Sequence, residues 1–493
     1  MDELMPPAAM RPRLIVDCGG RILSALLLTA DGQIVPCSQQ VRHVAARYVS
    51  SEVLFDPHVS EAPGFVWEEA LEVLAKSSAR NFFQRSRRVG LLRPWDERVS
   101  ADAVPIASPL AVLSSPVAMA DRAVDGALPA LAIALLEALL EPICRFVAEQ
   151  RIDARDVEPV VIVGAESGRR AVLALHKVFR RRGFRRLVVL RGDLATAMSL
   201  AASGEYLVCD VRNDDVRLSR LAVDSDGAER RFRVLSSETV RGIGWTYWLQ
   251  QIGGALRRFF PSDVRLDRAV TALLTGAPQH LTHGMLDAAL DDVWQRRQRE
   301  ELQRLLSGRV PALVTGDICG IAAIEQLFGA AVSVDVPMPE RRARAVAEAL
   351  LWMEEAAGRR LTVAPGGSLR LDSLRDGTAE LLTAEQLPEP GHDGYVEVEV
   401  DVAGEVESGQ PFLLHVLWGA DEFPGGNATL CALPVSIPDV NAARSLRIGF
   451  YLRRGRAGQR LDGTLDVRTA PRAAAVARAA FTEELPAFRS TTP

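Results

Sequence analysis

The first part of the chain alternates short apolar runs with longer amphipathic segments, which predicts strands and helices in turn. Apolar runs at 14–16, 24–29 and 34–35 predict three short strands, with a tight turn after Asp17. Residues 127–150 have the length and apolar face of a long helix. The chain therefore opens with a β-meander, and a long helix follows later.

A regular β-α-β alternation comes next. Apolar runs of strand length flank amphipathic segments of helical length, which is typical of an α/β domain. The predicted strands are 159–163, 187–190, 206–210, 216–223 and 312–314. The predicted helices are 169–181, 194–202, a helical region over about 244–308, a helix through Phe328 and a helix over 341–357, and residues 67–92 look helical and then basic.

The pattern changes after Pro365-Gly366-Gly367. Val396, Val398 and Val400 alternate with acidic residues, and a period of two with one polar face predicts half-buried antiparallel strands. Residues 365–470 are therefore expected to form an all-β domain, a small sandwich. The tail, 471–493, is expected to hold one short alanine-rich helix.

Composition and charge narrow the function classes. Of 493 residues, 48% are hydrophobic and 25% charged, as in globular proteins, and 58 basic against 63 acidic residues give a net charge of −5. A dedicated nucleic-acid binder is usually strongly basic, so the basic run 180–186 is interpreted as a solvated helix end. The amino-terminal segment lacks signal-peptide features, and the apolar stretch 127–136 is shorter than the ~20 residues of a membrane span. The six cysteines are scattered along the chain, which is typical of reduced thiols. Together with the charge balance and the missing membrane span, this leads us to expect a cytoplasmic protein that binds neither membrane nor nucleic acid.

Lysine is almost absent. Only Lys76 and Lys177 occur, so 56 of the 58 basic residues are arginine. Any chemistry that requires a lysine has two candidates in the chain.

Five short motifs follow one another in a recognisable order. They are Leu14-Ile15-Val16-Asp17-Cys18-Gly19-Gly20, Asp193-Leu194-Ala195-Thr196-Ala197, Leu207-Val208-Cys209-Asp210, Val240-Arg241-Gly242-Ile243-Gly244 and Leu313-Val314-Thr315-Gly316-Asp317. This order resembles the superfamily of actin, heat-shock chaperones and sugar kinases, and most closely the DnaK-type (70 kDa) heat-shock chaperones. The resemblance implies an α/β, actin-like two-lobed ATPase fold with ribonuclease H-like subdomains over 13–360. It also implies that the β-sandwich over 365–470 is similar to a peptide-binding domain.

The resemblance also implies a nucleotide site for ATP or ADP with Mg²⁺. By position, Asp17, Asp193 and Asp210 match the family's catalytic and metal-binding carboxylates, with Asp193 standing for a glutamate. The residues matched to nucleotide binding are Asp17, Gly19, Gly20, Arg21, Asp210, Gly242, Gly244, Gly316 and Asp317. In such a site, glycines let backbone N–H groups approach phosphate oxygens. Taken singly, Asp17 and Asp210 are also what ordinary strand ends carry.

Several positions depart from the family pattern. The second hairpin has Arg212-Asn213-Asp214-Asp215 where the family has three glycines and a threonine, so side chains and carboxylates replace a phosphate cradle. Arg217 replaces a further aspartate; it could pair with the carboxylates of that loop or contact a phosphate. The family lysine falls within a stretch that resembles 83–90, which contains arginine but no lysine. Because arginine is bulkier and always protonated, we predict weak or absent ATP hydrolysis, that is, a pseudo-ATPase.

Three functions compete. The first is a divergent DnaK-like, chaperone-type protein that binds polypeptide clients or partner proteins through the β domain, with Leu417-Trp418 as either groove lining or sandwich core. The second is a scaffold or interaction protein on the same fold, without a chaperone cycle. The third is an active small-molecule kinase, against which the loop at 212–215 argues. About 20 residues follow the sandwich, so no long helical lid is expected, and the family's leucine-rich linker motif is not visible between 358 and 372.

Overall fold

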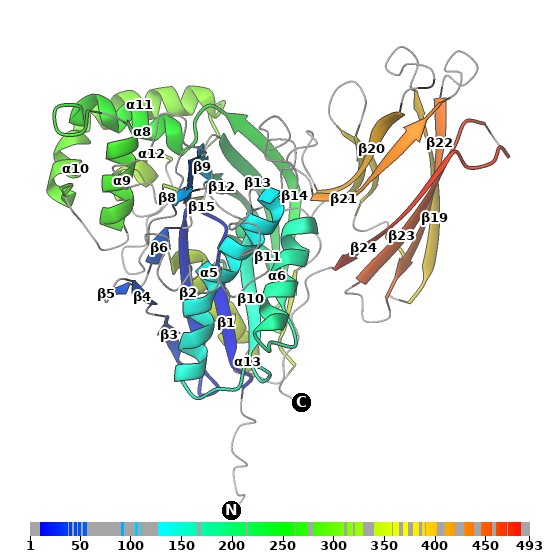
Figure 1. Cartoon of the computed structure of the whole chain (residues 1–493), viewed down its shortest axis with the longest axis horizontal. Helices are drawn as coiled ribbons and strands as arrows, with labels where there is room; N and C mark the ends of the chain where they lie inside the picture. The colour runs from blue at the N-terminus through cyan, green and yellow to red at the C-terminus, as the bar shows by residue number, and fades with distance from the viewer. Residues whose placement is uncertain are drawn as a thin grey trace, which may run out of the picture.

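The computed structural model describes most of the regular elements of the chain. The described residues are 10–37, 39–41, 44–46, 48–50, 53–56, 90–92, 104–106, 110, 127–164, 169–212, 215–261, 263–274, 280–309, 313–318, 321–328, 340–356, 358–363, 368–372, 378–383, 387–389, 391–401, 409, 411–419, 428–437, 445–455, 460–470 and 472–484. Helices and several β-sheets alternate along it, which confirms the mixed α/β class (Figure 1). Most of the predicted helical and basic region 67–92, with the arginines at the family lysine position, lies outside the described residues, but its end is not helical, because residues 90–92 form strand β8.

The first sheet contains the β-meander. Its strand order is β11-β10-β1-β2-β3, with β1 parallel to β10 and antiparallel to β2, and with β6 paired to β2. The strands are β1 Arg13–Asp17, β2 Ile22–Leu28, β3 Ile34–Pro36, β6 Tyr48–Ser50, β10 Glu158–Val163 and β11 Val188–Arg191. Short strands outside this sheet are β4 Gln39–Val41, β5 Val44–Ala46, β7 Val53–Asp56, β8 Gly90–Leu92 and β9 Val104–Ile106. The three predicted opening strands are therefore present.

The second sheet has the order β15-β12-β13-β14-β16, with β12 parallel to β15. Its strands are β12 Gly204–Val211, β13 Asp215–Ser225, β14 Glu229–Arg241, β15 Leu313–Gly316 and β16 Arg360–Val363. The predicted hairpin of β12 and β13 is confirmed, with Asp210 opposite Arg217. The parallel strands β1, β10 and β11 thus end at one edge of the first sheet, and β12 and β15 end at one edge of the second.

Two helices, α7 (Gly192–Ala197) and α13 (Arg341–Glu354), lie between the sheets. Their side chains share one core with Ile15 and Ile162 of the first sheet and with Val208 and Phe232 of the second. The alternate residues of β1 and β10 pack on the other face, against α5 (Ala127–Glu149) and α6 (Arg169–Arg181). Strand periodicity thus explains why the first sheet is apolar on both faces.

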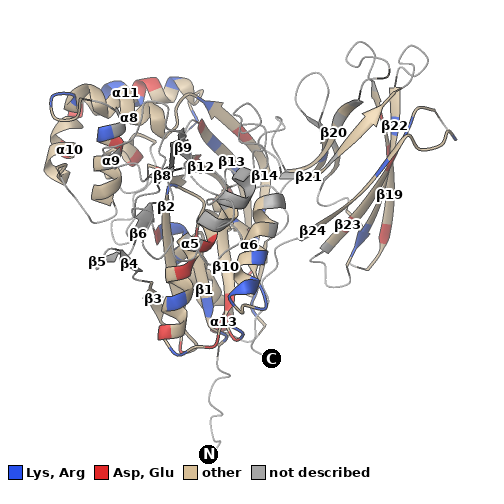
Figure 2. Ribbon diagram, viewed as in Figure 1, with Lys and Arg blue, Asp and Glu red and all other residues tan. Residues whose placement is uncertain are grey.

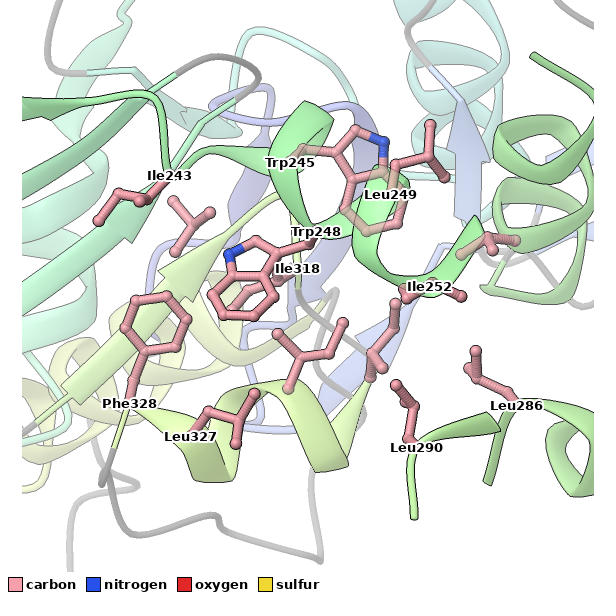
Figure 3. Close-up of a cluster of buried hydrophobic side chains, with 14 of the residues drawn as sticks. Ile243, Trp245, Trp248, Leu249, Ile252, Leu286, Leu290, Ile318, Leu327 and Phe328 are labelled. Carbon is pink, nitrogen blue, oxygen red and sulfur yellow. The ribbon is translucent and has the colours of Figure 1, made fainter. Parts of the chain in front are cut away.

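The other face of the second sheet carries a helical layer. The helices are α8 Trp245–Leu256, α9 Asp263–Leu274, α10 His283–Ala289, α11 Asp292–Leu305 and α12 Ala322–Leu327. Trp245 and Trp248 belong to its core, and Figure 3 shows Trp248 beside Ile318 and Phe328. The Trp248 and Phe328 ring centroids lie 5.7 Å apart in an edge-to-face arrangement. The tryptophans of α8 are therefore fixed by packing.

Residues after 367 form two four-stranded sheets that face each other across a separate core. One sheet has the order β18-β17-β20-β21, from β17 Ser368–Asp372, β18 Thr378–Thr383, β20 Pro411–Gly419 and β21 Ala428–Ser436. The other has the order β19-β22-β23-β24, from β19 Asp393–Asp401, β22 Ser445–Arg454, β23 Arg460–Arg468 and β24 Ala477–Glu484. Leu417 and Trp418 are both buried, and Trp418 belongs to the core between the two sheets, which supports the sandwich-core reading for Trp418.

The prediction of a short carboxy-terminal helix is wrong. Residues 477–484 form strand β24, paired antiparallel with β23. Phe481 is buried in the sandwich core, and a Cβ on Gly463 would lie 2.1 Å from its ring, so the phenyl group fills the space above that glycine. Strand pairing and burial of one aromatic side chain outweigh the helical preference of the alanines.

Charges are interspersed over the described surface, as Figure 2 shows along α11. The basic run that ends α6 includes Arg181 and Arg182, which pair with Glu137 and Glu141 of α5. None of the described helices is long and apolar enough to cross a bilayer. The basic run thus has partners within the fold.

Candidate functional site

The site lies where parallel strands of both sheets end. Asp17 is the last residue of β1, Asp210 lies near the end of β12, and Asp317 directly follows β15. The edge formed by the carboxyl ends of parallel strands is where α/β sheets commonly place their ligands. Strand topology thus brings Asp210 and Asp317 together, and the packing of the two sheets adds Asp17.

The centre of this site is the guanidinium of Arg342, from the first turn of α13. Its Nε donates to Asp17 Oδ2 at 2.7 Å and its Nη2 donates to Asp17 Oδ1 at 3.0 Å, a two-point contact. Its Nη1 lies 3.6 Å from Asp210 Oδ1. The exposed fractions of the three side chains are 6%, 4% and 1%. A protein cation therefore lies between the two carboxylates that were expected to hold Mg²⁺.

Two glycines surround this guanidinium. A Cβ on Gly19 would lie 3.2 Å from Arg342 Nη1 and Nη2, and a Cβ on Gly192 would lie 2.7 Å from Nη1. Gly19 was predicted to let a phosphate approach the backbone. In the structure, the space without a side chain is filled by Arg342.

Arg21, in the turn between β1 and β2, reaches the second sheet. Its backbone N–H donates to Asp317 Oδ1 at 2.7 Å, and its Nη2 forms an ion pair with Asp267 Oδ2 of α9 at 2.6 Å. Its guanidinium also lies 5.1 Å from the ring centroid of Trp245, whose Nε1 donates to Asp267 Oδ1 at 2.8 Å. A Cβ on Gly20 would lie 3.0 Å from Asp317 Oδ1. The backbone of Gly20 and both the backbone and the side chain of Arg21 therefore lie against side chains of the second sheet and its helices.

Asp193 lies near the site, but its carboxylate is engaged elsewhere. It is fully buried at the start of α7, where it accepts from Arg191 Nη2 at 2.6 Å and from Ser219 Oγ at 2.8 Å. Burial would raise the pKa of Asp193, but Arg191, Arg217 and Ser219 outweigh it and hold this pKa at about 2. Arg217 thus stabilises the Asp193 carboxylate, and Asp193 is committed to an internal ion pair.

The remaining predicted residues have structural positions at the edge of the site. Gly242 and Gly244 lie in the turn between β14 and α8, and Gly244 is the N-cap residue that precedes Trp245. Gly316 has a φ of +101°, and its missing side chain lets Asp317 N donate to Val211 O at 2.6 Å. In the altered loop, Arg212 Nε donates to Asp215 Oδ1 at 2.5 Å.

Arg342, Asp267 and Gly192 were not predicted as site residues. A signal for Arg342 does exist in the sequence. It shares the buried stripe of α13 with Val346, Leu350 and Met353, which recur at helical spacing. An arginine on the apolar face of an amphipathic helix indicates a buried carboxylate partner, because an unpaired buried charge is very costly.

The pKa of Asp317 leads to a pH-dependent prediction. Burial is the main cause that raises it and Asp210 adds to the rise, whereas Arg21 and Arg342 oppose it, and the resulting pKa is about 7. Between pH 4 and 7 the folded protein therefore holds a proton that the unfolded chain has lost, so this residue lowers the free energy of unfolding as pH rises, by about 1.4 kcal/mol per pH unit at most. In Asp317→Asn the amide oxygen can still accept from Arg21, so we expect the variant to gain stability over wild type as pH rises from 5 to 8.

Urea unfolding of the full chain at several pH values measures this gain. Asp287→Asn makes the same chemical change at an exposed carboxylate of α10 and is the control. Parallel stability profiles for Asp317→Asn and wild type would contradict the assignment of a protonated Asp317.

Metal and thiol chemistry receive little support from the described residues. Among them, no group of three His, Cys, Asp or Glu side chains is arranged to hold a metal ion. Burial raises the pKa of the Cys18 thiol, next to Asp17, and Asp17 raises it further, so Cys18 stays protonated. Arg342 supplies the cation that balances Asp17 and Asp210.

Comparisons with known proteins give no family. No protein-family model matches the chain, and no curated protein matches it. The function therefore has to be argued from the geometry of Asp17, Arg342, Arg21 and their partners.

Proposed function

We propose that this protein is a pseudo-ATPase of the actin and DnaK-type superfamily that acts as a chaperone-type binding protein, holding polypeptides or partner proteins through its β domain. The observation that carries the proposal is the position of the Arg342 guanidinium between Asp17 and Asp210. ATP hydrolysis in such a site requires a cation that bridges phosphate oxygens. While the guanidinium contacts both aspartates, a hydrated Mg²⁺ cannot occupy the position between them.

The architecture supports the actin-like assignment. Each of two sheets has a pair of parallel strands, an antiparallel hairpin follows β1 and β12, and α7 and α13 pack between the sheets. The four motifs at Asp17, Asp193, Asp210 and Asp317 lie on these elements in the expected order. These features favour a two-lobed core with its nucleotide cleft at the strand ends.

The charges of the site argue against binding a nucleotide phosphate. Three carboxylates, from Asp17, Asp210 and Asp267, and the carboxyl group of Asp317 with its raised pKa lie around two guanidinium groups, from Arg21 and Arg342. A phosphate would add negative charge to a site that already has an excess of carboxylates. Each unscreened like-charge contact at 4 Å costs about 1 kcal/mol even in water.

We expect no stabilisation by nucleotide. The melting temperature of the full chain should not rise when ATP or ADP is added with Mg²⁺, because a ligand raises apparent stability only if it binds the folded state. Differential scanning fluorimetry measures this, with an ordinary DnaK-type chaperone as the positive control. ATP turnover at a rate comparable with that chaperone would overturn the pseudo-ATPase proposal.

The β domain supplies the binding function in this proposal. Its outer sheet face exposes the paired rings of Tyr395 and Tyr451, with centroids 4.7 Å apart and planes tilted by 44°, among charged side chains of β19 and β22. The full chain should bind a subset of peptides on an array, and a Tyr395→Ser, Tyr451→Ser variant shows whether this face contributes.

A scaffold without peptide binding is the second candidate, and the burial of Leu417 and Trp418 favours it. Those two side chains are the apolar residues that the groove reading needed, and they are part of the interior. A peptide array on which the full chain binds nothing supports the scaffold.

A further inference from the structure

Charged side chains from the two sheets meet at their strand ends. Arg21 belongs to the first sheet, through the turn between β1 and β2, whereas Asp267, Trp245 and Asp317 belong to the second sheet and its helices. Arg21 makes a backbone hydrogen bond, an ion pair and a cation–π contact with this second group. One residue thus joins the two sheets by three kinds of contact.

Helix α13 provides a second bridge. It is fixed to the first sheet at both ends, because Arg342 binds Asp17 at one end of β1 and Glu354 binds Arg13 at the other, with Arg13 Nη2 2.8 Å from Glu354 Oε1. The contact between Arg342 Nη1 and Asp210 Oδ1 therefore joins this unit to the second sheet. Both bridges lie at the strand ends, where a ligand between the sheets would otherwise sit.

Burial strengthens the bridges. The side chains of Arg21 and Asp267 are 6% and 14% exposed, and those of Arg342 and Asp210 are 6% and 1% exposed. Ion pairs that are shielded from water attract more strongly than exposed pairs, because the effective dielectric constant around them is lower. Trp245 adds rigidity, since its ring, at the start of α8, is packed in the core (Figure 3) and its N–H orients Asp267.

We infer that Arg21 and Arg342 act as a built-in interlobe lock that holds the two sheets closed without any ligand. In a ligand-gated clamp, the bound molecule supplies the contacts that favour the closed state, and its removal allows opening. Here the protein's own guanidinium groups supply them, so the core stays closed and its state is independent of nucleotide. The lock goes beyond the proposed function, because it does not require the β domain to bind polypeptide.

Hydrogen exchange of the full chain, without nucleotide, tests the lock. The amide of Arg21 donates directly across the cleft to Asp317, so its exchange reports opening. In Asp267→Asn and in Arg21→Met, we expect exchange in peptides covering 18–23 to accelerate about tenfold or more over wild type, while peptides of β22 and β23 stay unchanged. Arg220→Met, which removes an exposed pair with Glu205, is the matched control and should leave 18–23 unchanged.

Two results would overturn the lock. One is rapid exchange at 18–23 in wild type that slows when ADP and Mg²⁺ are added. The other is unchanged exchange at 18–23 in both variants. Asp267→Asn preserves side-chain size and the acceptor for Trp245, so it distinguishes opening from unfolding even if Arg21→Met fails to fold. Far-UV circular dichroism checks the fold of each variant, and the nucleotide and peptide measurements test the proposed function separately.

Discussion

Replacing Arg342 with methionine is expected to destabilise the core by about 3–5 kcal/mol, because it leaves buried carboxylates without their cation. Methionine keeps an unbranched apolar stem, so the loss reports the charge more than the packing. Asp17 and Asp210 are 3% and 1% exposed and cannot turn to water without moving the strands. Urea unfolding of the full chain measures the loss, and Arg220→Met, at an exposed ion pair, should change stability by about 1 kcal/mol or less.

A second variant tests whether the guanidinium occupies a cation position. Arg342→Ala leaves space between Asp17, Asp210, Gly19 and Gly192, so added guanidinium ion or a divalent cation should raise its melting temperature, and matched sodium chloride should not. The double variant Asp17→Asn, Arg342→Met should lose about 1–3 kcal/mol less unfolding free energy than the sum of the two single variants, as for residues in direct contact. A loss for Arg342→Met no larger than that of the exposed control, or full additivity, would show that Arg342 is not the internal cation.

The strand ends of the site were predictable from the sequence, whereas its cation was not. Asp17, Asp210 and Asp317 each follow a short apolar run, and the parallel strands β12 and β15 end at the same edge, so local pattern and simple topology bring Asp210 and Asp317 together. Asp17 joins them only because the two sheets pack on either side of α7 and α13. Arg342 lies 325 residues from Asp17 along the chain. Only the packing of α13 between two sheets brings these residues together, and periodicity shows merely that Arg342 lies on the buried face.

The carboxy-terminal strand was also missed because it depends on contacts with distant residues, which local sequence pattern does not show. Alanine favours helix locally, but the choice at 477–484 depends on β23 offering an unpaired edge and on the space above Gly463 for Phe481. Likewise, Gly19 was predicted to let a phosphate approach the backbone. A glycine at a strand end indicates that another group packs closely against the backbone, but the sequence does not say which group. What comes close is decided by distant residues, here the guanidinium of Arg342.

Gly316→Ala is expected to be at least as damaging as the loss of Arg342. The φ of Gly316 is +101°, and a Cβ there would lie 2.1 Å from Val211 O and 2.7 Å from both Val211 N and Asp210 Oδ1. These are largely backbone atoms of the neighbouring strand, so β15 would have to separate from β12, and Asp317 would lose its bonds to Val211 and Arg21. We expect destabilisation by more than about 3 kcal/mol, beyond the 1–3 kcal/mol of left-handed strain alone.

Gly227→Ala separates the two causes. Gly227, in the hairpin between β13 and β14, has a φ of +88°, but a Cβ on it would meet no atom within 4 Å. It therefore carries the conformational strain without the clash and should cost about 1 kcal/mol. Urea unfolding and the soluble yield of the full chain compare the two variants. Equal losses would mean that backbone strain alone explains Gly316, and that the close approach of β15 to β12 does not need a glycine.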